Sequence, residues 1–226
     1  MKKMALIGLL VAVLALAACG PGEGPQDPRP RVLIIGDSIS LGYTPEVAAL
    51  LGDRAQVVHC PGNARHSWYG VVWRDKLVSG GPWDVIQFNW GLWDMCYRRP
   101  VRGGASVPDK ACGRVTIGLV EYRRNLEQVV ARLERTGATL VWASTTSVPA
   151  GERGRFSADV DRYNAVAAEI MRAHGIRITD LCAVSRAMPQ NLRVNPHNVH
   201  FTAEGYRRLA RAVVSGLPLA KTADLP

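Results

Sequence analysis

Two features are missing from this chain of 226 residues: paired zinc-binding cysteines and an excess of acidic side chains. It has five cysteines but no Cys-x-x-Cys pair, so we expect no zinc site, and we predict no other metal and no cofactor. Its 28 lysines and arginines outnumber 19 acidic residues, which gives a formal charge of +9. The arginines are scattered and no nucleic-acid-binding motif accompanies them, so we predict a basic, solvated surface and no nucleic-acid partner.

The N-terminal apolar run is too short to span a bilayer. It extends from Met4 to Ala18, whereas a spanning helix needs ~20 residues. Two lysines precede it, which is typical of a signal peptide over residues 1–18. The sequence Leu-Ala-Ala-Cys that ends at Cys19 resembles a bacterial lipobox. That resemblance implies cleavage before Cys19, a lipid on its sulfur and an outward-facing or periplasmic anchor in the cell envelope; the alternative is an ordinary signal peptide and a secreted protein.

Residues 19–30 are rich in glycine and proline and predict a tether, followed by one domain over residues 31–220. Strand and helix patterns alternate along this domain, and the strand candidates are almost continuously apolar. Such a pattern is typical of a parallel sheet covered on both faces. We therefore predict an α/β fold: a three-layer α/β/α domain whose five parallel strands have the flavodoxin-like order 2-1-3-4-5. The strand candidates are residues 31–35, 55–59, 84–88, 139–144 and 176–180.

Two long loops, residues 91–115 and 145–157, are expected at the carboxyl edge of this sheet, where long loops usually shape a binding site. Ser38 lies at the same edge, in Gly36-Asp37-Ser38 directly after the first strand. Ligand crevices of such sheets lie there, so Ser38 is a candidate nucleophile. The alternative is a serine that only closes the turn. We expect the following helix to begin at Pro45, capped by Thr44.

A candidate base for Ser38 lies near the other end of the chain. His200 belongs to a loop just before the last predicted helix. If that loop also lies at the carboxyl edge, the imidazole can take the proton of the Ser38 hydroxyl.

These motifs together resemble the SGNH or GDSL hydrolases. Gly-Asp-Ser follows the first strand, Val-His-Phe-Thr-Ala-Glu-Gly-Tyr lies in the last loop, and WDVIQFNWGLWDM resembles a third block that reads Asn-x-Gly-Leu-His-Asp in one subgroup. The resemblance covers nearly the whole domain. It implies the SGNH hydrolase fold and ester hydrolysis, with Ser38 as nucleophile and His200 as base.

The chain departs from the family at the oxyanion-binding positions. Trp93 stands where the family commonly has an asparagine, and Asn89 is an alternative side-chain donor. Arg65 occupies the position of a second-block glycine, whose backbone N–H is the expected donor. The Ser38 N–H is a third donor.

A second departure concerns the acid that orients the histidine. The family has Asp three or two residues before it, where this chain has His197 and Asn198. Loss of such a carboxylate can cost about 10⁴ in rate. Asn198 or a backbone carbonyl could hold the His200 Nδ1–H instead, or an acid such as Asp180 could reach the ring.

Tryptophans and cysteines complete the candidate residues. Trp90 and Trp68 flank the third and second blocks, and flat indole faces suit contact with a sugar or an acyl group. We expect a disulfide between Cys96 and Cys112, which bracket the first long loop. Cys60 and Cys182 are expected to be unpaired, because the strand order places them on opposite sheet edges, about 19 Å apart.

We therefore expect a serine esterase of the cell envelope that acts on short acyl esters, such as acetyl groups on carbohydrate, through a Ser38 acyl-enzyme. The missing acid leaves open a glycan-binding protein with weak or no activity. Acyl transfer to an envelope polysaccharide is a further alternative.

Overall fold

The computed structural model describes residues 27–219, so the predicted signal peptide and Cys19 lie outside the described residues. A five-stranded parallel sheet forms its centre, with the order β2-β1-β3-β7-β8. This arrangement confirms the predicted fold class and the order 2-1-3-4-5. The strands are β1 (Arg31–Ile35), β2 (Gln56–His59), β3 (Val85–Phe88), β7 (Thr139–Ala143) and β8 (Arg177–Thr179).

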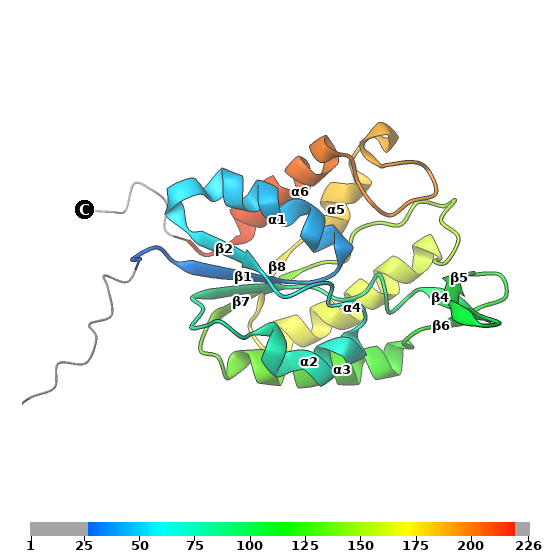
Figure 1. Ribbon diagram of the computed structural model, residues 1–226, viewed down its shortest axis with the longest axis horizontal. Coiled ribbons are helices and arrows are strands. Elements are labelled where there is room, and N and C mark those ends of the chain that lie inside the picture. The colour runs from blue at the N-terminus through cyan, green and yellow to red at the C-terminus, as the bar shows by residue number, and fades with distance from the viewer. Residues whose placement is uncertain (1–26, 220–226) are drawn as a thin grey trace, which may run out of the picture.

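Helices cover both faces of the sheet, as the continuous apolar strands predict (Figure 1). Helices α1, α5 and α6 pack together on one face, and α2, α3 and α4 pack on the other. Their bounds are α1 (Ser38–Leu51), α2 (Ser67–Leu77), α3 (Leu119–Glu134), α4 (Ser157–Ala173), α5 (Leu181–Arg186) and α6 (Ala203–Gly216). Short 3₁₀ turns lie at Gly52–Arg54 and Gln190–Leu192. Among residues 27–219, no helix combines the length and apolar character that crossing a membrane requires.

Helix α1 begins earlier than the sequence predicts. Asp37 is its N-cap and accepts the Ile39 N–H at 2.9 Å, so the helix starts at Ser38 and Pro45 lies inside it. Packing favours the longer helix: a Cβ on Gly42 would lie 2.3 Å from the Tyr206 ring of α6, so the two helices approach closely there. Ser38 is consequently the first residue of a helix rather than part of an open turn.

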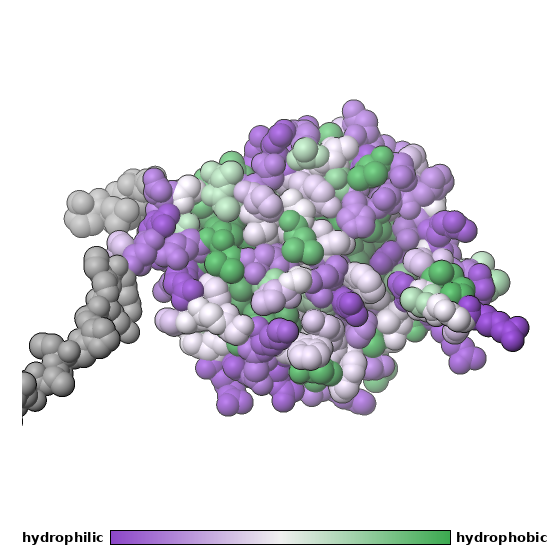
Figure 2. All heavy atoms as spheres, in the orientation of Figure 1, coloured by the Kyte–Doolittle hydropathy of each residue, from purple (hydrophilic) through white to green (hydrophobic). Residues whose placement is uncertain are grey.

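The first long loop contains a small sheet that the sequence pattern did not indicate. Strands β4 (Tyr97–Val101), β5 (Gly104–Pro108) and β6 (Arg114–Val115) form an antiparallel sheet of order β5-β4-β6. It projects from one end of the molecule, beyond the start of α1 (Figure 1). Charged and proline residues in these strands hid the alternation that predicts a half-buried strand. Figure 2 shows hydrophilic side chains over most of this face and apolar ones in small groups.

Candidate active site

Ser38 lies at the amino end of α1, immediately after β1. A side chain on Gly36 would lie 2.7 Å from Ser40 Oγ, so the tight turn between strand and helix requires glycine there. Backbone N–H groups in the first turn of a helix have no partner within the helix, and the helix dipole favours negative charge at that end. The Ser38 N–H is therefore available to an oxyanion.

The structure brings His200 to Ser38. Thr202 caps α6 through its side chain, and His200 lies in the loop two residues earlier. Its Nε2 is 2.8 Å from Ser38 Oγ, although the two residues are 162 positions apart. The expected nucleophile–base geometry is thus present at the carboxyl edge of the sheet.

Asn198 holds the far side of the histidine ring. Its Oδ1 is 2.7 Å from His200 Nδ1 and also accepts the His200 backbone N–H at 3.0 Å. A backbone N–H can only donate, so the atom facing Nδ1 must be the amide oxygen. Nδ1 consequently carries the proton, and the Nε2 lone pair faces the Ser38 hydroxyl.

The other two candidate orienting residues serve elsewhere. His197 is exposed, and its Nδ1 is 2.9 Å from the Gly151 carbonyl oxygen. Asp180 caps α5, where its Oδ1 accepts the Ala183 N–H and the Ser144 hydroxyl. Asn198 is thus the residue that orients the ring, and its side chain is neutral.

The surroundings of His200 favour its neutral form. Burial lowers the pKa of the imidazole below its ordinary value, and the positive charge of Arg155 lowers it further. The ring is therefore an unprotonated base at neutral pH. The same surroundings make the imidazolium that forms during reaction less stable.

The side chain of Asn89 does not serve as the expected oxyanion donor. Its Nδ2 donates to the Ala143 carbonyl at 2.7 Å and to Thr145 Oγ1 at 3.2 Å. Both amide hydrogens are engaged, and they join the end of β3 to the end of β7. This correction depends on residues more than fifty positions away, which the local sequence does not reveal.

Arg65 and Trp93 are the other oxyanion candidates. Arg65 has a left-handed backbone with φ 49°, uncommon for a residue other than glycine. Its N–H donates to Asn63 Oδ1 at 2.8 Å, so that donor is already used within the turn. Trp93 is partly buried, and the Arg98 guanidinium lies 5.4 Å from its ring centre.

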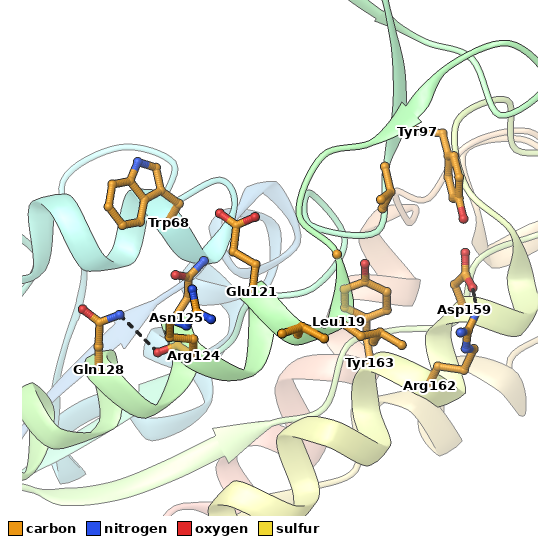
Figure 3. Close-up of a pocket in the computed structure, with 13 residues that line it drawn as sticks. Trp68, Tyr97, Leu119, Glu121, Arg124, Asn125, Gln128, Asp159, Arg162 and Tyr163 are labelled. Atoms are coloured by element: carbon orange, nitrogen blue, oxygen red, sulfur yellow. Dashed lines mark hydrogen bonds and ion pairs between the residues drawn. The ribbon is translucent and has the colours of Figure 1, made fainter.

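The two tryptophans predicted to contact substrate lie in different surroundings. Trp90 is only 1% exposed, and its Nε1 donates to the Ala64 carbonyl at 3.1 Å, so it is a core residue. Trp68 is 48% exposed at one end of a groove of about 590 Å³ (Figure 3). Tyr97 and Asp159 lie at the other end, and Glu121 of α3 stands between them.

The expected disulfide is not formed. All four cysteines among residues 27–219 are free thiols: Cys60, Cys96, Cys112 and Cys182. Cys96 is buried, and its Sγ would lie 3.0 Å from a Cβ on Gly154, whereas Cys112 is exposed in a turn held by Asp109. The small β4–β6 sheet orders this loop through backbone hydrogen bonds, without a covalent bridge between the two cysteines.

The sequence analysis missed two residues that lie near the active site, Arg155 and Glu152. They lie in the second long loop, and both side chains are less than a tenth exposed. The only sequence signal for them was the position of that loop at the carboxyl edge of the sheet. In the described part of the chain, no group of three or more His, Cys, Asp or Glu side chains is placed to hold a metal ion.

Comparison with known proteins places this geometry in a family. A model of the GDSL-like lipase/acylhydrolase family matches residues 34–208, which include both Ser38 and His200. No curated protein matches the chain in sequence.

Solved structures with low sequence identity share the fold. An acetyl xylan esterase is similar at 14% identity and a TM-score of 0.66, over 82% of this chain and 98% of that one. A lipase/acylhydrolase from Enterococcus faecalis is similar at 18% identity and a TM-score of 0.66, over 82% and 94%. A catalytic mutant of an acetylxylan esterase from Geobacillus stearothermophilus is similar at 16% identity and a TM-score of 0.66, over 84% and 95%. The chain belongs to the GDSL-like lipase/acylhydrolase family and is an ester hydrolase of the SGNH fold.

Proposed function

We propose that the chain is a serine esterase that removes short acyl groups, acetyl groups on carbohydrate above all, through a Ser38 acyl-enzyme. The observation that carries this proposal is the hydrogen-bonded series from Ser38 Oγ to His200 Nε2 and from His200 Nδ1 to Asn198 Oδ1. Each group in it has the protonation state that its step requires.

In the first half-reaction, Ser38 Oγ attacks the ester carbonyl carbon while its proton moves to His200 Nε2. The carbonyl oxygen becomes an oxyanion beside the Ser38 N–H at the amino end of α1, and one such donor is typically worth about 3 kcal/mol in the transition state. When the tetrahedral intermediate breaks its bond to the alcohol, His200 gives the proton to the leaving oxygen.

The second half-reaction repeats these steps with water. His200 Nε2 takes a proton from the water as its oxygen attacks the acyl-enzyme carbonyl, and then returns that proton to Ser38 Oγ. The acid leaves and the hydroxyl is restored. Asn198 keeps the ring in one orientation throughout, because its oxygen accepts the Nδ1–H in both the neutral and the charged ring.

Solved structures that share the fold support a short acyl group. Two of them are an acetyl xylan esterase, at 14% identity, and a catalytic mutant of an acetylxylan esterase, at 16% identity. Turnover should therefore fall steeply from acetyl to butyryl and longer esters.

The groove that ends at Trp68 offers a surface for a carbohydrate chain, outside the catalytic pair, since neither Ser38 nor His200 lines it. Its partly exposed indole face offers a sugar ring an apolar platform. Beside it, Glu121, Arg124 and Gln128 line one side along α3 (Figure 3). Charged and amide side chains of this kind bind sugar hydroxyls through hydrogen bonds.

The test is hydrolysis of p-nitrophenyl acetate and of acetylated oligosaccharides by the full chain and by Ser38→Ala. We expect Ser38→Ala to abolish both activities. Activity that survives this change would refute the assignment.

Asn198 favours a second candidate, a glycan-binding protein with weak chemistry, because an amide stabilises the imidazolium less than a carboxylate does. Specific glycan binding without labelling of Ser38 by a fluorophosphonate would support it. Transfer of the acyl group to an added sugar acceptor, measured by product analysis, would identify a transferase instead.

We also propose that the protein works in the cell envelope, anchored through lipid on Cys19. The apolar run before Cys19 and the basic composition support this location. In a bacterial host, the wild-type chain should partition into detergent and Cys19→Ser should not. Equal partitioning of the two would contradict the anchor.

A further inference from the structure

Arg155 is a buried cation held in one position by the loop between β7 and α4. Its Nε donates to the Leu92 carbonyl at 2.5 Å, and its Nη1 lies 3.0 Å from Glu152 Oε1. The other oxygen of that carboxylate accepts the Gly154 N–H at 2.8 Å. Because removing both charges from water is costly, the hydrogen bonds at Nε, at Nη1 and at both Glu152 oxygens are needed to keep such a pair buried. The guanidinium is therefore fixed rather than free to move with solvent.

Arg155 lies among the segments that build the active site. Leu92 belongs to the third block, next to Trp93. The loop of Arg155 contacts the histidine loop through the Gly151 carbonyl and His197 Nδ1, 2.9 Å apart.

The charge of Arg155 acts on groups at both sides of the nucleophile. Burial raises the pKa of the Asp37 carboxyl, and the Ile39 N–H and the charge of Arg155 oppose that rise. Burial is the larger cause that lowers the pKa of His200, and the charge of Arg155 is the second cause. Asp37 precedes Ser38 and His200 accepts its proton, so the two groups on which this charge acts flank the reacting hydroxyl.

One edge of the guanidinium has no protein partner. Nε and Nη1 are engaged, whereas Nη2 forms no hydrogen bond with the described residues and is not sealed from solvent. Two expected oxyanion donors, the Asn89 amide and the Arg65 N–H, are meanwhile bound to other groups. The site therefore has a fixed donor to spare at Arg155, while the Asn89 amide, one of its expected side-chain donors, is already engaged.

We propose that Arg155 Nη2–H binds the carbonyl oxygen of the ester and stabilises the oxyanion, in place of the family's third-block asparagine. This inference rests on the proposed Ser38 chemistry. A charged donor forms a shorter and stronger hydrogen bond to an oxyanion than an amide does. No carboxylate stabilises the imidazolium of His200 in this site. The charge of Arg155 instead stabilises the oxyanion that forms on the substrate.

The test removes both charges of the Arg155–Glu152 ion pair, so that neither charge is left buried without a partner. In the full chain, Glu152→Gln/Arg155→Met should lower kcat by about 10²–10³-fold, the usual loss for one oxyanion donor, and change KM by less than about threefold. The acid limb of its kcat/KM profile should move to higher pH, because the pKa of His200 rises when the nearby cation is removed. Added guanidinium at millimolar concentration should restore part of the rate in Arg155→Ala.

Arg132→Met is the matched control. Arg132 is also ion-paired, with Asp75 at 2.6 Å, but it lies between α2 and α3, so its loss should leave kcat and the pH profile unchanged. Unfolding temperatures identify variants that fail to fold. If the double variant fails, Arg155→Lys replaces it, because lysine retains the positive charge. This variant should keep the acid limb of kcat/KM at the pH of the wild type and lose kcat.

Two outcomes would overturn the proposal. One is a kcat within threefold of wild type in the folded double variant. The other is a lower kcat without rescue by guanidinium and without movement of the acid limb, which would indicate a purely structural role. Failure of the proposed function itself is distinguishable, because the wild-type chain would then hydrolyse no ester and its Ser38 would not react with a fluorophosphonate.

Discussion

Asn198→Asp should make this enzyme faster. The substituted side chain keeps an oxygen at the position that accepts His200 Nδ1–H at 2.7 Å and the His200 backbone N–H at 3.0 Å. The amide nitrogen of Asn198 donates to no described residue, so its replacement by oxygen breaks no hydrogen bond within the protein. The change therefore adds one negative charge beside the imidazole and leaves the geometry in place.

The magnitude follows from the distance between the two charges. Opposite unit charges about 4 Å apart attract by roughly 1 kcal/mol in water and 4 kcal/mol at an effective dielectric constant of 20. The His200 ring is partly buried, so the carboxylate should stabilise the imidazolium by a value between these limits. That range corresponds to a rise of about one to three units in the pKa of His200 and a gain of at least about fivefold in kcat.

The assay is the pH profile of p-nitrophenyl acetate hydrolysis. Because the base works only when neutral, a higher pKa moves the acid limb of kcat/KM to higher pH, and rates are compared on the plateau above it. Asn195→Asp is the control: its Oδ1 accepts only the His197 backbone N–H in the same loop, so both quantities should stay near wild type. An acid limb and a plateau rate unchanged in Asn198→Asp would refute the role given to Asn198.

Three further predictions concern other parts of the molecule. Trp68→Ala should slow deacetylation of an oligosaccharide but not of p-nitrophenyl acetate, whereas Trp73→Ala, equally exposed on α2 but outside the groove, should change neither rate; equal loss on both substrates would contradict the groove assignment. Burial raises the pKa of Asp94 to about 7, above its value of 3.8 when unfolded, so the folded state loses stability at this group as the pH rises between these values. Asp94→Asn should therefore flatten the dependence of Tm on pH over that interval, and parallel Tm curves would disprove it. In the folded protein Cys112 should react quickly with a thiol reagent and Cys96 slowly, as mass spectrometry of the adducts can show; a disulfide between them would contradict the structure.

The layer architecture and the strand order were predictable from the almost continuously apolar strands. Such strands form a parallel sheet that helices cover on both faces. Strand β1 is buried along nearly its whole length, and parallel neighbours on both sides complete its backbone hydrogen bonds. The approach of His200 to Ser38 was predictable for the same reason, since both follow elements that end at one edge of the sheet. These inferences needed only local patterns and the topology they imply.

The remaining features depend on contacts between distant segments. The side chain of Asn89 binds the end of β7, and this partner cannot be recognised from the residues around Asn89. The start of α1 followed Asp37 rather than Thr44, because two equally good capping residues compete and packing against α6 decides between them. Arg155 gives no periodic signal, and its role emerges only from its contacts with Leu92 and Glu152.

The central claim is that His200, held by Asn198, activates Ser38. The most direct measurement is mass spectrometry of the full chain after brief exposure to a fluorophosphonate. We predict one adduct, on Ser38, in the wild type and a rate of labelling at least 100-fold lower in His200→Ala, about 3 kcal/mol in the barrier. No adduct on Ser38, or labelling at the same rate without His200, would contradict the account.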